Sequence, residues 1–215
     1  MKSPSPDKWQ IFGGYTFQRT SGLLNGFGFN ATCEGSEYGC DEFSSFNSNG
    51  GQFAISYFPR HHLGVTFQGT FEVSGTRDVT YYAEDPPTQS INMQSYLFGP
   101  TYRHGIYGGK ASLFYQVLAG VTHNTFNAST EDVYFCYSYT TDTYLLSCST
   151  NNFTLATGGG VDFRLNRHIA VRPAQLEYWE EQIPYRDYYP GYPYQYSLKE
   201  GIEGLRYSAG AVFNF

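Results

Sequence analysis

The last eleven residues of the chain alternate strictly, and one of the two sets of side chains is entirely apolar or aromatic. Leu205, Tyr207, Ala209, Ala211, Phe213 and Phe215 form this set, and Arg206, Ser208, Gly210, Val212 and Asn214 form the other. Successive side chains point to opposite faces of a β-strand, whereas a helix repeats every 3.6 residues. The C-terminal segment therefore predicts a strand with one apolar face.

The same alternation recurs along the chain and predicts eight strands. They lie near 9–18, 52–57, 63–74, 91–102, 111–122, 153–164, 169–181 and 205–215. Composition supports an all-β fold, because aromatic residues make up 19% of the chain, charged residues only 15%, and there are just two Met. Such a composition is poor in strong helix formers and rich in strand formers. No segment approaches the ~18 apolar residues of a membrane helix, but the strands match the ~9–11 residues of a tilted membrane strand.

The connections between these strands alternate in length. Residues 58–62, 103–110 and 165–168 form short connections, while those near 20–50, 76–90, 123–152 and 182–202 are long. Four of the five His and many Arg and Lys fall on the short side, and acidic residues collect on the long side. Outer-membrane barrels have short periplasmic turns and long extracellular loops. The pattern predicts an eight-stranded antiparallel up-and-down transmembrane barrel.

Polar side chains on the other face of the strands are expected to fill the barrel interior. Eight strands leave room only for side chains, so buried charges must pair there. We expect Arg172 and Arg206 to pair with Asp162 and Glu177, with a bulge at Pro173 that turns both Arg172 and Glu177 inward. A soluble lipocalin-like barrel with an apolar ligand inside is the alternative, as is a narrow outer-membrane channel. The expected inward set is Gln10, Gln18, Gln52, Gln68, Glu72, Gln94, Gln116, Asp162, Arg172, Glu177 and Arg206.

Several segments, taken with this register, resemble a known family. They are Tyr96-Leu97-Phe98-Gly99-Pro100, residues 158–163 (GGGVDF), residues 169–173 (IAVRP) and the terminal Phe215. The chain resembles the eight-stranded outer-membrane β-barrel proteins of Gram-negative bacteria, the OmpA/OmpX-type and opacity-like superfamily. The resemblance covers residues 8–215 as one barrel domain after a tail of residues 1–7, without a peptidoglycan-binding domain.

This resemblance implies an outer-membrane location and contact with outer-membrane lipid. It also makes Phe215 similar to the family's C-terminal signal, which the barrel insertion machinery reads during assembly. Residues 1–4 (MKSP) contain no apolar segment of the kind found in signal peptides. We therefore expect a mature chain that carries an initiator Met after loss of a signal peptide.

The four cysteines form two local pairs in polar, loop-like segments. Cys33 lies near Cys40, and Cys136 near Cys148. An even number of such residues favours disulfides in an oxidising compartment over free thiols, and their spacing does not fit a zinc site. We predict the bonds Cys33–Cys40 and Cys136–Cys148, both outside the strands.

The sequence offers little support for an enzyme, a cofactor or a metal site. No GxSxG, HExxH or Walker motif occurs. The three glycines at 158–160 are read as a mid-strand packing device, and His61-His62 as turn residues. His123 is the single histidine on the long-loop side, where Asp132 and Asp142 share its segment. We expect a non-enzymatic protein.

The last long connection is rich in tyrosine and proline, and it is the strongest candidate for an interaction surface. Tyr provides large, rigid contact area at low entropic cost. Two interpretations stay open, an interfacial aromatic girdle or a surface for adhesion, self-assembly or a protein partner. A net charge of −6 argues against nucleic acid. The candidate residues are Tyr185, Tyr188, Tyr189, Tyr192, Tyr194 and Tyr196.

Overall fold

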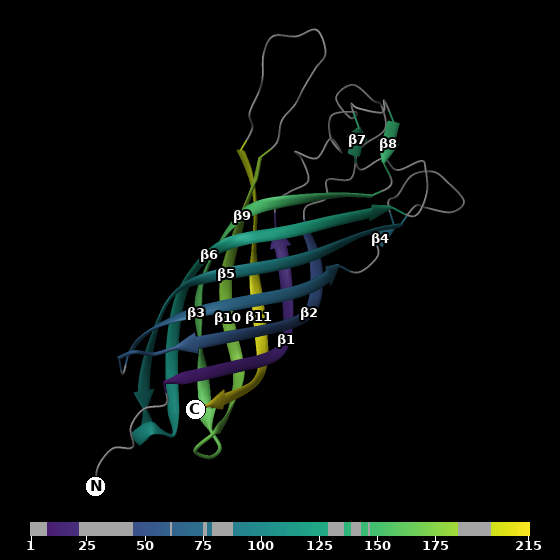
Figure 1. The fold of residues 1–215 in the computed structure, drawn as a ribbon. Helices are drawn as coiled ribbons and strands as arrows, with labels where there is room; N and C mark the ends of the chain where they lie inside the picture. The colour runs from purple at the N-terminus through teal and green to yellow at the C-terminus, as the bar shows by residue number, and fades with distance from the viewer. Residues whose placement is uncertain are drawn as a thin grey trace.

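The computed structural model describes residues 8–21, 45–60, 62–74, 77–78, 88–128, 136–138, 143–145, 147–184 and 199–215. Eight long strands form a closed barrel (Figure 1). They are β1 (Trp9–Ser21), β2 (Ser45–Tyr57), β3 (Leu63–Ser74), β5 (Thr88–Ile106), β6 (Ala111–Ala128), β9 (Ser147–Arg164), β10 (Ile169–Pro184) and β11 (Lys199–Asn214). Three short strands, β4 (Arg77–Asp78), β7 (Cys136–Ser138) and β8 (Thr143–Leu145), and the 3-10 turn η1 (Tyr107–Gly109) complete the described elements.

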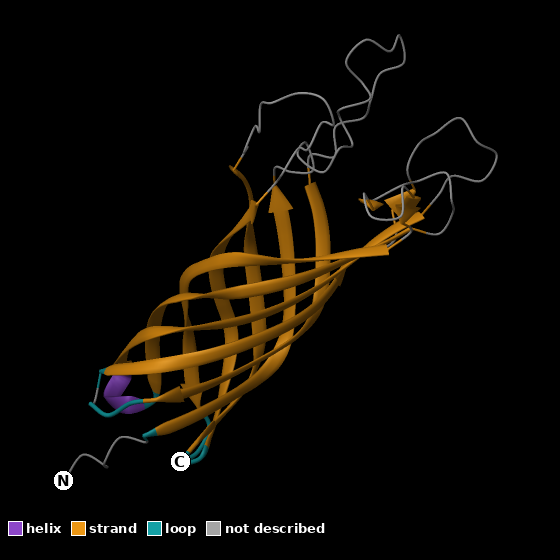
Figure 2. Ribbon diagram, turned by 45° about the horizontal axis from the view of Figure 1, so that its top comes forward, coloured by secondary structure: helices purple, strands orange, loops and turns teal. Residues whose placement is uncertain are grey.

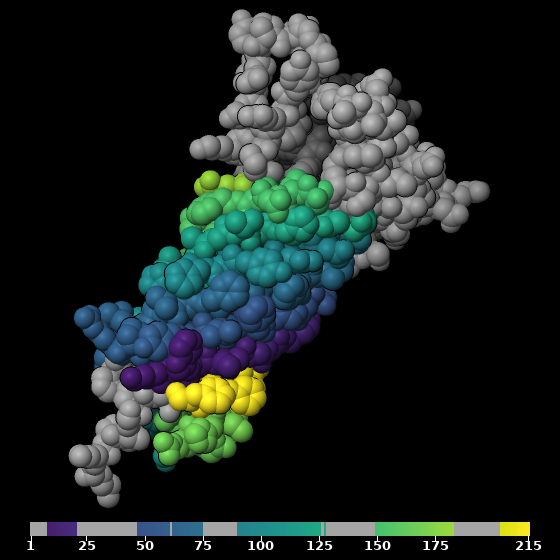
Figure 3. Space-filling model, viewed as in Figure 1, coloured from purple at the N-terminus to yellow at the C-terminus, as the bar shows by residue number. Residues whose placement is uncertain are grey.

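Every long strand pairs antiparallel with its neighbours. The order β3-β2-β1-β11-β10-β9-β6-β5 closes through a β3–β5 pairing. The first and last strands lie side by side (Figure 3), and Gln10 on β1 is opposite Asn214 on β11. The Phe215 carbonyl accepts hydrogen bonds from the amides of Lys8 and Trp9 at 3.0 and 3.2 Å. The predicted all-β, eight-stranded, up-and-down barrel is confirmed.

Two connections at the end where the C-terminus lies show why the chain reverses there (Figure 2). Between β5 and β6, Gly108 and Gly109 have φ values of 64° and 87°, a region in which L side chains are strained. Between β9 and β10, the Asn166 side-chain oxygen accepts the amides of His168 and Ile169, both at 2.8 Å. Local residue chemistry thus fixes both turns.

An apolar belt surrounds the outside of the barrel. The eight members predicted from the sequence are between 38% and 53% exposed, and apolar side chains exposed in this way suit contact with lipid and not with water. Polar and charged side chains make up most of the barrel interior, so the apolar face of the strands points outward. A lipocalin-like barrel with an apolar interior for a ligand does not fit this arrangement. Among the described residues no helix is both long enough and apolar enough to cross a membrane. The predicted belt comprises Trp9, Tyr15, Phe67, Phe71, Phe153, Phe163, Tyr207 and Phe213.

The belt ends at a level that we call the polar rim. The rim consists of the outward-facing side chains Arg19, Asn47, Gln94, His123, Asn151, Glu180 and Glu203. Neighbouring strands place these residues side by side, as in the pairs Gln94 with His123 and Glu180 with Glu203. Strands β5, β6 and β9 continue beyond the rim for six, five and four residues. At these three strands the barrel wall therefore extends beyond the apolar belt.

Two expectations about the faces of the strands need correction. Gln94 was expected inside, but it is exposed on the outward face because Met93 and Ser95 occupy the inward positions of β5. The cysteines were expected outside strands, but Cys136 lies in β7 and Cys148 in β9. Cys33 and Cys40 lie outside the described residues, and the two disulfides stay predictions.

The bulge predicted in β10 is present at Pro173. The pairing of β10 with both neighbours shifts there, between Arg172 and Gln175 on one side and between Val171 and Ala174 on the other. The shift places Arg172 and Glu177 on the same inward face, although their spacing is odd. Tyr207 on β11 donates its hydroxyl to the Pro173 carbonyl at 2.5 Å, which satisfies a backbone group that the bulge leaves outside the ladder.

Candidate functional site

The lower part of the barrel interior is built around Arg172. Its Nε lies 2.7 Å from Asp162 Oδ1, its Nη2 lies 3.2 Å from Asp162 Oδ2, and its Nη1 donates to Gln175 Oε1 at 2.7 Å. The guanidinium carbon lies 4.5 Å from the centre of the Phe12 ring and 4.0 Å from that of Phe114. A bidentate ion pair between two aromatic faces satisfies this buried charge and fills the lumen at its level.

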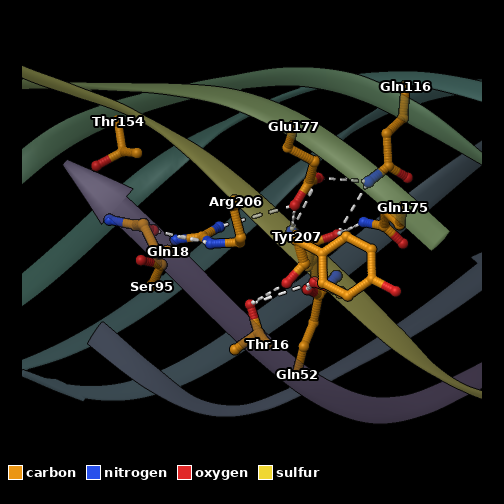
Figure 4. A network of polar contacts seen from close by, with 12 residues as sticks. Thr16, Gln18, Gln52, Ser95, Gln116, Thr154, Gln175, Glu177, Arg206 and Tyr207 are labelled. Carbon is orange, nitrogen blue, oxygen red and sulfur yellow. Dashed lines mark hydrogen bonds and ion pairs between the residues drawn. The ribbon is translucent and has the colours of Figure 1, made fainter. Parts of the chain in front are cut away.

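A second guanidinium, that of Arg206, lies at the centre of the lumen and is fully buried (Figure 4). Its Nε donates to Gln18 Oε1 at 2.9 Å and lies 3.3 Å from Glu72 Oε1. A longer contact of 3.9 Å joins Nη1 to Glu177 Oε2. Arg206 therefore balances two carboxylates that come from opposite walls of the barrel.

Three glutamine side chains connect this central charge cluster across the lumen. Gln68 donates to both oxygens of Glu177 at 3.1 Å, and Gln116 donates to Glu177 Oε1 at 2.8 Å and to Gln68 Oε1 at 2.9 Å. Gln175 reaches Gln68 Oε1 at 3.4 Å and so joins the Arg172 level to the Arg206 level. The network fills the lumen at this level with hydrogen-bonded side chains.

An apolar layer follows along the same strands on the long-loop side of the cluster. Leu97, Leu118, Ala156 and Trp179 are in contact there, and each is at most 2% exposed. Because Leu118 and Trp179 follow Gln116 and Glu177 by two residues, they point inward one step further along β6 and β10. This layer separates the charged centre from the upper lumen.

The upper lumen contains a hydroxyl chain and a buried carboxylate. Thr122 Oγ1 lies 2.9 Å from Ser95 Oγ and 2.7 Å from Thr154 Oγ1. Glu181 is fully buried, and its Oε1 accepts hydrogen bonds from the side-chain amides of Asn124 and Asn152. Asn124 lies in β6 and Asn152 in β9, each beyond the limit that alternation predicted for its strand.

The residues expected to form the interior network are brought together, with one difference in pairing. Asp162 and Arg172 form the expected pair, whereas Arg206 lies nearer to Glu72 than to Glu177. Reasoning from the sequence missed Glu181 and its two amide partners. The signal was available, because Glu181 follows Glu177 by four residues and so shares its inward face.

The other residues singled out from the sequence lie outside this interior network. His123 lies on the polar rim, with Nδ1 2.8 Å from the Asn151 side-chain oxygen. Asp132 and Asp142 lie outside the described residues, so the idea of an acid–base pair with His123 stays untested. Phe215 is 64% exposed beside Trp9, and its role as an assembly signal stays a prediction. The tyrosines of the candidate interaction surface, residues 185–196, also lie outside the described residues.

Known proteins resemble this chain in structure but not in sequence. No family model matches the chain. No curated protein sequence matches it either. The fold is similar to that of Ail, the attachment invasion locus protein of Yersinia pestis, solved with the heparin analogue sucrose octasulfate, with 16% identity and a TM-score of 0.53 over 98% of this chain and 100% of that one.

Two further solved structures are similar along their whole length. The outer membrane protein OprG from Pseudomonas aeruginosa has 13% identity and a TM-score of 0.53, over 98% of this chain and 96% of that chain. The Neisserial surface protein NspA has 8% identity and a TM-score of 0.50, over 96% and 97%. With its closed ring of eight strands, its outward apolar belt and its polar interior, the chain has the fold of the eight-stranded outer-membrane β-barrels.

Proposed function

We propose that the protein is a non-enzymatic outer-membrane anchor that presents its long connections at the cell surface for adhesion, self-assembly or binding of a partner. The observation that carries this proposal is the filled lumen. Arg172, Arg206 and Trp179 occupy three successive levels and are at most 6% exposed. A barrel filled in this way offers its own end surfaces to partners more readily than a passage through its centre.

The strands that extend beyond the polar rim also support a role at the cell surface. Strands β5, β6 and β9 run past the polar rim, and at ~3.3 Å per residue their extensions reach ~13–20 Å along the strand direction. Such a wall is not needed to cross the membrane, because its outward side chains beyond the rim, such as Thr125 and Ser149, are polar. It does extend the barrel wall beyond the apolar belt.

The sequence of the connection between β10 and β11 fits a contact surface. The chain has 21 Tyr, and six of them lie between residues 185 and 196. Aromatic-rich surface segments of this kind are common in binding sites. The name of Ail includes attachment and its structure holds a heparin analogue. Adhesion by the long-loop end of this chain is in keeping with that likeness.

The test replaces residues 185–196 with a short Gly/Ser turn in the full chain. Proteoliposomes carrying the wild type are expected to cluster with one another or to be retained on immobilised matrix proteins and glycans, and the variant is expected to lose this behaviour. Heat-modifiable gel migration should show that its barrel still folds. The matched control keeps the loop length and changes only the six Tyr to Ser.

Two outcomes would contradict the proposal. Binding that survives loop replacement but falls after Arg172→Ala or Glu72→Ala would place the activity in the lumen. Stepwise ion currents through planar bilayers, of a size that Arg206→Ala increases, would favour the narrow-channel alternative, since removal of a central side chain widens the path.

A further inference from the structure

A cluster of oxygen atoms without hydrogen-bond donors lies in the upper lumen. Glu181 Oε2, Asn124 Oδ1 and Asn152 Oδ1 have no hydrogen-bond partner, and their side chains are at most 1% exposed. The three groups are in direct contact, because both amide nitrogens donate to the remaining oxygen of Glu181. Buried acceptors rarely stay unsatisfied in folded proteins, so three together call for a missing positive or donating group.

The charge of the interior points to a cation. Among the described residues, the buried ionisable groups are the acids Glu72, Asp162, Glu177 and Glu181 and the bases Arg103, Arg172 and Arg206, which gives four negative charges against three positive. Arg172 pairs with Asp162, and Arg206 pairs with Glu72 and Glu177. The carboxylate of Glu181 thus lacks a guanidinium of its own, an arrangement that is strongly unfavourable when nothing compensates it.

The cluster lies toward the long-loop end of the barrel interior. Asn124, Asn152 and Glu181 each follow a member of the polar rim, namely His123, Asn151 and Glu180. The cluster therefore lies at the level of the rim, beyond the apolar belt. On its other side, the apolar layer around Trp179 separates it from the charged centre. The route from the long-loop end to Glu181 therefore does not cross the apolar layer around Trp179, and Met93 and Ile91 are the buried apolar side chains of β5 on that side.

We propose that Glu181, Asn124 and Asn152 bind a hard divalent cation, with Ca²⁺ as the probe. Rotation of each amide about its terminal bond exchanges nitrogen for oxygen, so the two hydrogen bonds to Glu181 Oε1 are given up and the ion receives two amide oxygens and a carboxylate. Water completes the six to eight oxygen ligands that Ca²⁺ takes. A single carboxylate gives a weak site, with Kd on the order of 10⁻⁴–10⁻³ M as in extracellular modules.

The test uses Tb³⁺ luminescence, because the structure supplies an internal sensitiser. The chain has two Trp, and Trp179 lies two residues from Glu181 on the same inward face. The other, Trp9, is 49% exposed at the opposite end of the barrel and is changed to Phe in the background chain. In uncharged detergent micelles, Trp excitation is expected to give Tb³⁺ emission that Ca²⁺ displaces.

Substitutions distinguish ion binding at this site from binding at other carboxylates. Glu181→Gln is expected to abolish the Trp-sensitised emission, while Glu203→Gln, an exposed carboxylate of the polar rim, should leave it unchanged. Asn152→Asp adds a second carboxylate and is expected to tighten Ca²⁺ binding about tenfold. This gain of affinity tests the site independently, should Glu181→Gln fail to fold.

Several results would overturn the proposal. Emission of equal strength in wild type and Glu181→Gln would place the ion elsewhere. Absence of emission in both, with a thermal unfolding midpoint that Ca²⁺ does not move, would mean that a proton alone neutralises Glu181. An Asn152→Asp chain with unchanged Ca²⁺ affinity would remove this residue from the site.

Discussion

At the scale of single residues, Arg172 shows how a charge is kept inside the barrel. Its partner Asp162 supplies both carboxylate oxygens, and two aromatic rings cover the guanidinium. We expect Asp162→Asn to lower the free energy of unfolding by about 3–5 kcal/mol, because it leaves a buried charge without its counter-ion. Urea titration of the barrel in lipid vesicles measures this change.

The control for this prediction removes both charges. Asp162→Leu combined with Arg172→Met is expected to destabilise the barrel less than Asp162→Asn alone, since well-packed apolar groups can replace a buried ion pair at little cost. A double variant that is less stable than Asp162→Asn would contradict this explanation. It would show that the ion pair itself stabilises the barrel, beyond neutralising the charge of Arg172.

Tyr207 illustrates the same requirement on the lipid side. Its hydroxyl donates to the Pro173 carbonyl, which the bulge leaves without a ladder partner. Tyr207→Phe should cost about 1 kcal/mol, because a carbonyl facing hydrocarbon then has no donor. Tyr15→Phe on the neighbouring strand is the control, and equal losses of stability in the two variants would contradict the assignment.

At the scale of strands, Gly158 allows a polar and a charged side chain from its two neighbouring strands to meet. It lies in β9 directly between Gln116 on β6 and Glu177 on β10, which are joined by a hydrogen bond of 2.8 Å. A Cβ at this position would lie 2.1 Å from the Leu176 carbonyl oxygen. This close approach confirms the packing interpretation of the three glycines.

A substitution at Gly158 is therefore expected to disturb both the ladder and the network. Gly158→Val should destabilise the barrel by about 1–3 kcal/mol, the usual cost of overpacking, or prevent folding in vesicles. Gly13→Ala serves as the control, since a Cβ at that outward position meets nothing within 4 Å. Refolding yields from heat-modifiable migration compare the two, and equal yields would speak against the role given to Gly158.

The ends of the strands show what alternation could predict and what it could not. At the short-turn end, predicted and observed limits coincide at Tyr57, Leu63 and Ala111. At the other end, β6 and β9 run six residues further than predicted. Beyond the polar rim the outward side chains of these strands are polar too, so the contrast between an apolar outward face and a polar inward face disappears although the backbone ladder continues. Gln94 was misplaced for the same reason, because β5 changes character at this level.

At the scale of the whole molecule, the sequence predicted which residues face inward but not which of them meet. Alternation gives the face of a side chain, whereas its height in the lumen depends on strand tilt and stagger, which only closure of the barrel determines. Asp162 and Glu177 were thus predicted as the partners of Arg172 and Arg206, while Glu72 on β3 lies nearer to Arg206 than Glu177 does. Glu181 escaped notice because its partners Asn124 and Asn152 stand in segments read as loops.

Membrane insertion is the property that the whole barrel must satisfy at once. Ala209 faces outward near the middle of the belt, opposite Tyr15 on β1. Ala209→Arg should cost ~2–4 kcal/mol near the bilayer midplane and block folding into lipid vesicles, whereas Asn47→Arg, outward on the polar rim, should cost ~0–1 kcal/mol. Heat-modifiable migration after refolding into vesicles measures both. Because the two variants add the same charge to the same surface, only a belt surrounded by hydrocarbon explains a difference between them, and equal folding of the two would contradict a transmembrane position for this barrel.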